Sequence, residues 1–175
     1  MKSQQKEERL SQQLLFGLVL FDSKEASNIE EAIDSLLKID YPSGKLKIIV
    51  SSHINKNPNV YINHINTLLE KFKHTRLLMN HGLETKTEVE YNAFSLCQHA
   101  NYLVKMNVNQ EIPSDFFVKI NENITKKDTV LVYNDLVALP YKLVSRNYLL
   151  FNDYDKTSDK LIEKSKQDNL FKNIK

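Results

Sequence analysis

The feature of this sequence that most constrains its fold is a regular alternation of short apolar runs with segments of helical periodicity. Continuous apolar runs of about four to eight residues are typical of strands that are buried on both faces of a sheet. The runs occupy residues 14–21, 46–50, 76–79, 102–106 and 130–133. They predict the strands of a mostly parallel sheet.

Helix signals fill the intervals between these runs. Ser27 with Glu30, and Thr85 with Glu88, have the spacing of a capping box, in which two side chains satisfy two unpaired amides at a helix start. Apolar residues recur at helical spacing over 29–37, 62–72, 89–100 and 117–124. Each interval is therefore predicted to contain a helix.

Strands that alternate with helices favour an α/β fold, because right-handed crossovers place helices on both faces of a mostly parallel sheet. The strands expected to be neighbours are those near Val19, Ile49, Leu78 and Val104. A chain of 175 residues fits a single domain. We expect a polar N-terminal segment over 1–13 and a charged C-terminal helix over 156–175, whereas 141–151 fits either a helix or a strand.

Composition excludes several other designs. Three scattered glycines exclude a Walker A loop and a Gly-x-Gly-x-x-Gly turn, which need clustered glycines to bring amides onto phosphate. The lone Cys97 excludes an internal disulfide and a cysteine-based zinc site. The 24 basic and 22 acidic residues are well mixed, so no nucleic-acid partner is expected. A polar start, and no apolar stretch of about 20 residues, predict a cytoplasmic protein without a membrane span.

Several different short motifs follow one another at a characteristic spacing. They are Ser35–Leu37 before Tyr41–Pro42, Ile48–Asn55 at a strand end, Tyr91–Ala93 on a helix, Asn101–Tyr102, and Asn107–Asn109. In this order and register they resemble the Ser-Leu-Leu before Tyr-Pro, the strand ending in Asp-Asp, the Arg-Asn-Ala, the Glu-Tyr and the Asp-x-Asp of family-2 glycosyltransferases. The resemblance runs from about Leu14 to Asp115, with a weaker similarity to about Asp159.

The resemblance implies a GT-A-like three-layer α/β/α domain that binds a nucleotide sugar beyond the carboxyl ends of its strands. The nucleotide-binding positions that it implies are Asp22, Lys24, Glu25, Ser52, His53 and Asn92. The residue types also allow simpler interpretations. A loop histidine such as His53 is often only solvated, and Lys24 beside Glu25 equally well forms a surface pair of little energetic value.

The metal site of the family has no charged counterpart in this chain. In the family, the Asp-x-Asp carboxylates hold Mn²⁺ or Mg²⁺ against the diphosphate, because hard cations prefer anionic oxygens. Asn107 and Asn109 stand at these positions, so no tight metal site is expected, and Mn²⁺ or Mg²⁺ is a cofactor only if the chain is an active enzyme. The alternative is that the two asparagines merely end a strand and turn the chain. The catalytic base has a faint counterpart, for which Asp159 is the candidate.

Two functional hypotheses follow from this pattern. The first is a glycosyltransferase-like nucleotide-sugar-binding domain in which metal-dependent sugar transfer is weak or lost. The second is a non-catalytic structural or protein-interaction module that keeps only the fold and binds a protein partner. The abundance of Asn, Lys and Ile indicates an AT-rich genome, which admits a viral source and then a location in the host cytoplasm.

Overall fold

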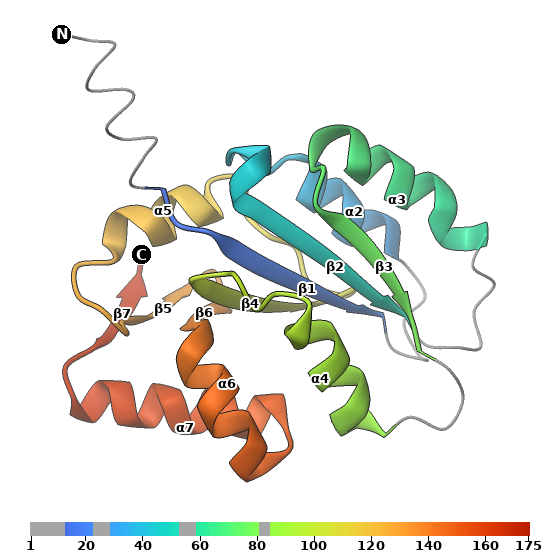
Figure 1. The fold of residues 1–175 in the computed structure, drawn as a ribbon. Coiled ribbons are helices and arrows are strands. Elements are labelled where there is room, and N and C mark those ends of the chain that lie inside the picture. The colour runs from blue at the N-terminus through green and yellow to red at the C-terminus, as the bar shows by residue number, and fades with distance from the viewer. Residues whose placement is uncertain (1–12, 23–28, 53–58, 81–84) are drawn as a thin grey trace, which may run out of the picture.

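The computed structural model describes residues 13–22, 29–52, 59–80 and 85–175 (Figure 1). Strands and helices alternate through most of this part of the chain, as the apolar runs predict. In chain order the elements are β1 (Phe16–Asp22), α2 (Ile29–Leu37), the 3-10 helix η1 (Ser43–Lys45), β2 (Leu46–Ser52), α3 (Asn59–Lys71), β3 (Thr75–Met79), α4 (Lys86–Ser95), β4 (Tyr102–Asn107), α5 (Phe116–Asn123), β5 (Val130–Tyr133), β6 (Leu136–Pro140), α6 (Tyr141–Phe151), α7 (Tyr154–Gln167) and β7 (Phe171–Ile174).

The strands form one seven-stranded sheet in the order β3-β2-β1-β4-β6-β5-β7. Parallel pairing joins β3, β2, β1 and β4, which confirms the neighbours expected from the sequence. Only β6 runs antiparallel to its neighbours β4 and β5. The architecture is thus a mostly parallel α/β sheet.

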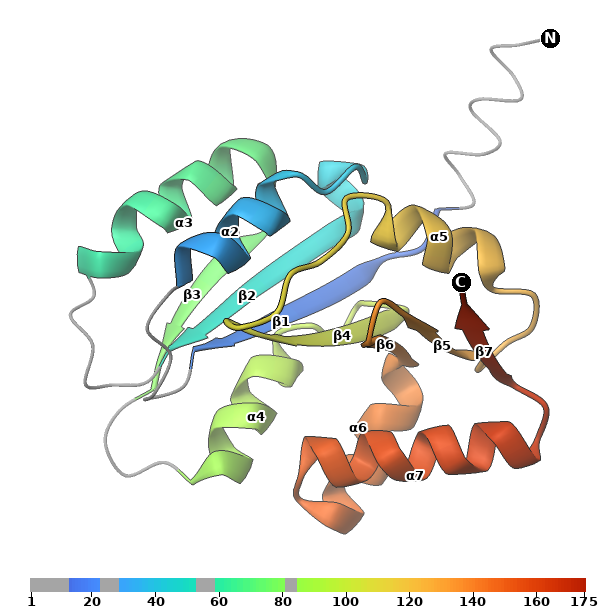
Figure 2. The ribbon, with the colours of Figure 1, turned by 180° about the vertical axis from the view of Figure 1, so that it is seen from behind.

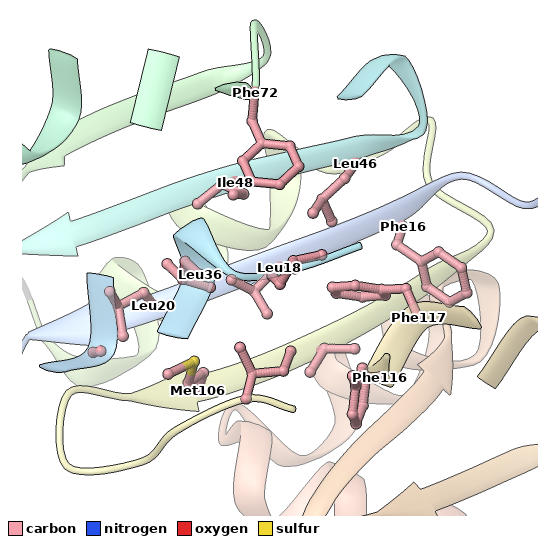
Figure 3. Packing of buried hydrophobic residues seen from close by; sticks show 14 of the residues in the cluster. Phe16, Leu18, Leu20, Leu36, Leu46, Ile48, Phe72, Met106, Phe116 and Phe117 are labelled. Carbon is pink, nitrogen blue, oxygen red and sulfur yellow. The ribbon is translucent and has the colours of Figure 1, made fainter. Parts of the chain in front are cut away.

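Helices cover both faces of the sheet and make three layers (Figures 1 and 2). On one face, the side chains of α2, α3 and α5 pack with alternate residues of the strands, and aromatic rings such as Phe16, Phe72 and Phe117 fill this core (Figure 3). On the other face, α4, α6 and α7 pack over Val19, Ile49 and the strand residues beside them. None of the helices within the described ranges is long and apolar enough to cross a membrane.

The close packing of the second core depends on a glycine in the central strand. A Cβ atom built on Gly17 would lie 2.7 Å from Cβ and 2.8 Å from Sγ of Cys97. Cys97 is buried, and its burial raises the pKa of the thiol to about 12. It is a small core residue that fits against β1 only because position 17 has no side chain.

The C-terminal third corrects two expectations. The charged helix expected over 156–175 begins at Tyr154 and ends at Gln167, and Phe171–Ile174 instead pair with β5 as β7. The sequence analysis also did not predict β6, which follows β5 after a two-residue turn. Residues 141–151, which fitted a helix or a strand, form α6.

Two capping boxes are predicted from the sequence, and the structure describes the one at the start of α4. Thr85 caps α4 with the expected box, since its hydroxyl accepts from the Glu88 amide while the Glu88 carboxylate accepts from the Thr85 amide at 2.7 Å. The box expected at Ser27 lies outside the described residues. The predicted continuation of this helix to Ala100 is wrong, because α4 ends at Ser95 and turns follow.

Candidate functional site

The register of the parallel strands gathers several predicted site residues at one edge of the sheet. Asp22, the last residue of β1, lies opposite Ser52, the last residue of β2. On the other side of β1, Phe21 lies opposite Asn107, the last residue of β4. This edge is formed by the carboxyl ends of the strands, where ligands of open α/β sheets bind.

A buried tyrosine joins the ends of β1 and β2. The Tyr61 hydroxyl from α3 donates a hydrogen bond to Asp22 and accepts one from the Ser52 hydroxyl. All three residues are buried. Burial, reinforced by the hydrogen bond to Asp22, raises the pKa of Tyr61 above its usual value, so the hydroxyl stays protonated and remains a donor at neutral pH.

Asn80, the residue after β3, completes this strand-end cluster, which consists of Asp22, Ser51, Ser52, Tyr61 and Asn80. Its side-chain amide donates to the Ser51 hydroxyl at 3.0 Å and to the Ser52 carbonyl at 2.9 Å. Its amide oxygen, Oδ1, is buried and has no hydrogen-bond partner among the described residues. An unpaired buried acceptor costs about 1–3 kcal/mol, so this oxygen favours a ligand that offers an N–H or O–H group.

Among the other predicted nucleotide-binding residues, Asn92 is the one that the structure describes. Lys24, Glu25 and His53 lie outside the described residues. Asn92 lies on α4 with an exposed side chain, and in the described part of the chain no hydrogen bond joins it to the strand-end cluster. Asp159, the candidate base, is exposed on α7. The roles proposed for these residues stay predictions.

Asn107 and Asn109, which the resemblance assigns to the Asp-x-Asp positions, lie in a turn after β4. Asn107 ends β4, and its amide donates to the Gln110 side chain at 2.8 Å while its carbonyl accepts from the Gln110 amide at 2.9 Å. Both asparagine side chains are exposed. Amide oxygens without charge are weak ligands for Mn²⁺ or Mg²⁺, and no group of three His, Cys, Asp or Glu side chains lies together among the described residues. This donor set does not fit a tight divalent-metal site.

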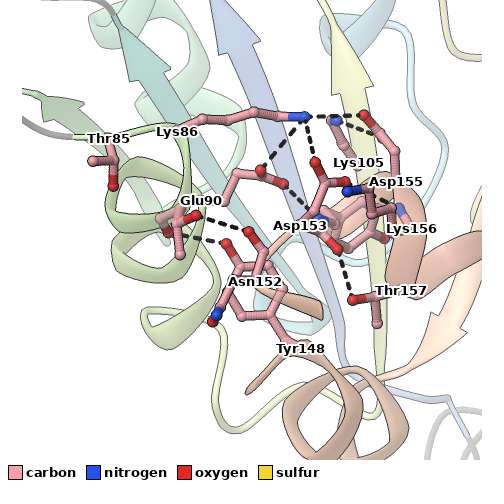
Figure 4. A network of polar contacts seen from close by, with 12 residues as sticks. Thr85, Lys86, Glu90, Lys105, Tyr148, Asn152, Asp153, Asp155, Lys156 and Thr157 are labelled. Carbon is pink, nitrogen blue, oxygen red and sulfur yellow. Dashed lines mark hydrogen bonds and ion pairs between the residues drawn. The ribbon is translucent and has the colours of Figure 1, made fainter. Parts of the chain in front are cut away.

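A second polar network lies on the opposite face, between the starts of α4 and α7 (Figure 4). Lys86 of α4 contacts Asp153 at 3.2 Å and Asp155 at 3.4 Å, and Lys105 of β4 contacts Asp155 at 2.8 Å. The Lys105 ammonium also lies 5.6 Å from the ring centre of Phe21. The network therefore ties two helix starts to the carboxyl end of the sheet.

Glu90 is the buried member of this network. Its carboxylate accepts from the Tyr154 amide at 3.1 Å, and its other oxygen lies 3.8 Å from Lys86. Burial raises the pKa of Glu90 above its usual value, although Lys105 and Lys86 act in the opposite direction. Ionised Glu90 is thus less favourable in the folded protein than in the unfolded chain.

The pH dependence of stability should report this burial. A carboxyl group with a raised pKa in the folded state favours folding while it is protonated, and this contribution is lost as the pH rises through the folded-state pKa. Glu90→Gln should therefore increase the free energy of unfolding more at pH 7 than at pH 4, as measured by urea denaturation. The exposed Glu163 on α7 provides the control, because Glu163→Gln should change the free energy of unfolding equally at pH 7 and pH 4. An equal effect of Glu90→Gln at both pH values would contradict the prediction.

Comparison with known proteins was decisive only at the level of structure. No protein-family model and no curated protein sequence matches the chain. The glycosyltransferase GlyE of Streptococcus pneumoniae matches 92% of this chain and 45% of its own, with a TM-score of 0.60 and 12% identity. The mannosyltransferase PcManGT of Pyrobaculum calidifontis, in complex with GDP-Man and Mn²⁺, matches 74% of this chain and 46% of its own, with a TM-score of 0.56 and 14% identity. The 4-diphosphocytidyl-2C-methyl-D-erythritol synthase of Anaerococcus prevotii matches 92% of this chain and 88% of its own, with a TM-score of 0.57 and 15% identity.

The likeness is one of fold. At these identities the matches show a GT-A-like architecture, shared with glycosyltransferases and with a synthase of a cytidine-diphosphate compound. The chain spans less than half the length of the two glycosyltransferases. Tyr61, which joins the two strand ends of the cluster, was not predicted from the sequence. Asn80 was not named as a site residue, although it begins the segment after the strand expected at 76–79, and side chains at the carboxyl ends of parallel strands face ligands.

Proposed function

We propose that the strand-end cluster binds the nucleoside part of a nucleoside diphosphate or nucleotide sugar, and that sugar transfer by this chain is weak or absent. The fold supports this assignment, since one solved structure with the same architecture is a mannosyltransferase in complex with GDP-Man. Lys24, Glu25 and His53 directly follow the strands that supply Asp22 and Ser52. They are the proposed contacts to the remainder of the ligand.

The proposal rests mainly on the buried Oδ1 of Asn80, which has no hydrogen-bond partner among residues 13–22, 29–52, 59–80 and 85–175. Nucleobases present ring and exocyclic N–H groups along one edge, and such a donor would satisfy this buried acceptor. The rest of the cluster is held in place by hydrogen bonds to Tyr61 and within the strand ends. A polar cluster whose other hydrogen bonds are formed favours a ligand that donates to its remaining acceptor.

The neutral donor set at the end of β4 supports the second half of the proposal. Two asparagines offer no charge to a divalent cation, and a departing diphosphate would then have to be neutralised by side-chain cations. Lys24 is the nearest such residue in sequence to the strand-end cluster. We therefore infer that nucleotide binding does not depend on Mn²⁺ or Mg²⁺.

Thermal stability measured with nucleotides tests the proposal directly. At least one of UDP, CDP and GDP should raise the melting temperature, because a ligand at about 100 times its Kd stabilises by about 2.7 kcal/mol. For a chain of this length that corresponds to roughly 5–10 °C. The shift should be the same with Mn²⁺ and with EDTA.

A matched pair of variants assigns the binding to the cluster. Asn80→Ser replaces the amide oxygen by a hydroxyl on a shorter side chain, which withdraws the acceptor from the ligand, and should weaken nucleotide binding by about tenfold or more in calorimetry. Asn123→Ser is the control, since Asn123 lies on α5 and its side-chain amide donates to the Lys119 carbonyl within that helix. Each Kd is compared with that of the unmodified protein after its folding has been checked. No shift at millimolar nucleotide, or equal binding by Asn80→Ser, would refute the proposal.

A further inference from the structure

A pocket of about 280 Å³ lies between α4 and α6, on the face of the sheet away from α2 and α3. The strand-end cluster belongs to the other face, because Tyr61 packs in the core beneath α2 and α3. The volume is near the lower end of the range for small-molecule sites, which is about 300–1,000 Å³. The pocket therefore has the size for one small ligand and is separate from the proposed nucleotide site.

Every one of the nine residues that line this pocket is uncharged. In a chain with 26% charged residues, such a surface on two exposed helices selects against phosphates and carboxylates, because it offers them no cation. Polar groups are nevertheless present. Ser95 and Gln98 line it from α4 and the turn that follows, and Ser145 lines it from α6. The ligand that matches this lining is neutral and rich in hydrogen-bonding groups.

Aromatic rings form the wall of the pocket. The ring of Tyr91 stacks on that of Tyr148, with centres 6.4 Å apart and planes 30° apart, and Phe94 meets Tyr148 edge to face at 6.1 Å. Tyr148 is fixed, because it is buried and its hydroxyl donates to the Thr87 carbonyl at 2.9 Å. Tyr91 remains 53% exposed, so it presents an aromatic surface to a ligand without being needed to close the core.

We propose that this pocket binds a neutral sugar ring. A pyranose has an apolar C–H face that packs on an aromatic ring, and its hydroxyl groups match uncharged serine and glutamine side chains. An acidic sugar or a nucleotide phosphate would find no cation among the lining residues. A purely apolar ligand would make no hydrogen bond to the side chains of Gln98 and Ser145, nor to the hydroxyl oxygen of Ser95, which itself donates to the Asn92 carbonyl. The proposal does not depend on nucleotide binding at the strand-end cluster.

The test uses ligand-observed saturation-transfer NMR on the full chain. The probes are the methyl glycosides of glucose and mannose and N-acetylglucosamine, each up to about 20 mM, since a single ring is expected to bind with a millimolar Kd. At least one should receive saturation from the protein. Amide shifts should change at Tyr91, Ser95 and Ser145. Glucuronic acid, which differs from glucose by a carboxylate, should bind more weakly than methyl glucoside.

Variants test whether sugar binding depends on the aromatic ring of Tyr91. Tyr91→Ala should weaken sugar binding on the order of fivefold, whereas Tyr91→Phe keeps the ring and should bind like the unmodified protein. Ile62→Ala removes a side chain of α3 that is 46% exposed on the other face and should change nothing. Asn80→Ser should also leave sugar binding unchanged, which separates this pocket from the nucleotide site.

Three outcomes would overturn the proposal. They are no saturation transfer to any of the three neutral sugars, transfer that is unchanged in Tyr91→Ala, and binding of glucuronic acid that equals or exceeds that of methyl glucoside. If the protein binds a neutral sugar but no nucleotide, the proposed function is refuted and the sugar pocket is not.

Discussion

Replacing Asn107 and Asn109 together by aspartate is expected to create a site that binds Mn²⁺ much more tightly than the native chain does. Both side chains are exposed at the end of β4, and each substitution adds one negative charge. At an effective dielectric constant of about 20, unit charges about 4 Å apart attract by about 4 kcal/mol, before the dehydration of the metal is subtracted. Since about 1.4 kcal/mol is tenfold, Mn²⁺ affinity should increase at least a hundredfold, to be measured by calorimetry.

The control for this double variant adds the same charge elsewhere. Asn66 on α3 and Asn173 on β7 are both exposed, and changing both to aspartate should leave Mn²⁺ affinity almost unchanged. Restored metal binding need not restore sugar transfer, because the candidate base remains unassigned. Tight, stoichiometric Mn²⁺ binding by the unmodified protein would show that the asparagines are sufficient ligands, and would favour an active metal-dependent enzyme.

Replacing Gly17 by alanine should destabilise the protein by about 1–3 kcal/mol, because the new methyl group would overlap Cys97. Neither residue can move away easily, since Gly17 lies in β1, which pairs with strands on both sides, and Cys97 is buried in the turn after α4. The loss corresponds to a melting temperature lower by roughly 3–10 °C. Thermal and urea denaturation provide the measurement.

Gly44 is the matched control for this substitution. A Cβ atom at Gly44 meets nothing within 4 Å, so Gly44→Ala should change stability by less than about 0.5 kcal/mol. Removing the opposing atoms should relieve the overlap. The double variant Gly17→Ala with Cys97→Gly is therefore expected to be no less stable than Cys97→Gly alone. A further additive loss in the double variant would show that the destabilisation has another cause.

The first four strands could be predicted because each signal is local and agrees with the global fold. The apolar runs around Val19, Ile49 and Val104 are buried on both sides, which leaves no other placement than the middle of a parallel sheet. The capping box at the start of α4 depends only on Thr85 and Glu88, three positions apart, and it forms as expected. Local propensity and long-range pairing thus specify the same structure in this part of the chain.

The region after β5 could not be predicted in the same way. A two-residue turn at Asn134 and Asp135 joins β5 to β6, and both residues have positive φ angles of 50° and 62°. Such a turn is usually marked by a glycine, which this one lacks, so the signal for a hairpin was weak. The strand β7 is short and half-exposed, and it has no continuous apolar run. It follows the charged helix α7, whose end is marked by no glycine or proline, so the sequence does not indicate where the helix stops.

The candidate site was predicted only where it follows strand ends. Asp22 and Ser52 were assigned from their positions in the resemblance, and the register brings them together. Tyr61 was not assigned a role, because it lies just before the apolar residues expected over 62–72 and nothing in the local sequence indicates that its hydroxyl reaches another element. The pairing of Lys105 with Asp155 joins residues 50 positions apart, and no local pattern indicates it.

Tyr61 belongs to the hydrophobic core through its ring and to the strand-end cluster through its hydroxyl, so one residue serves folding and the proposed site together. A large change at this position would remove a fully buried ring and would also release the two strand ends that its hydroxyl joins. Selection for a stable fold would by itself retain the polar geometry of the site, even in a chain that no longer transferred a sugar. Under the proposed function, binding can therefore outlast catalysis, because the groups proposed to hold the ligand also join the ends of β1 and β2.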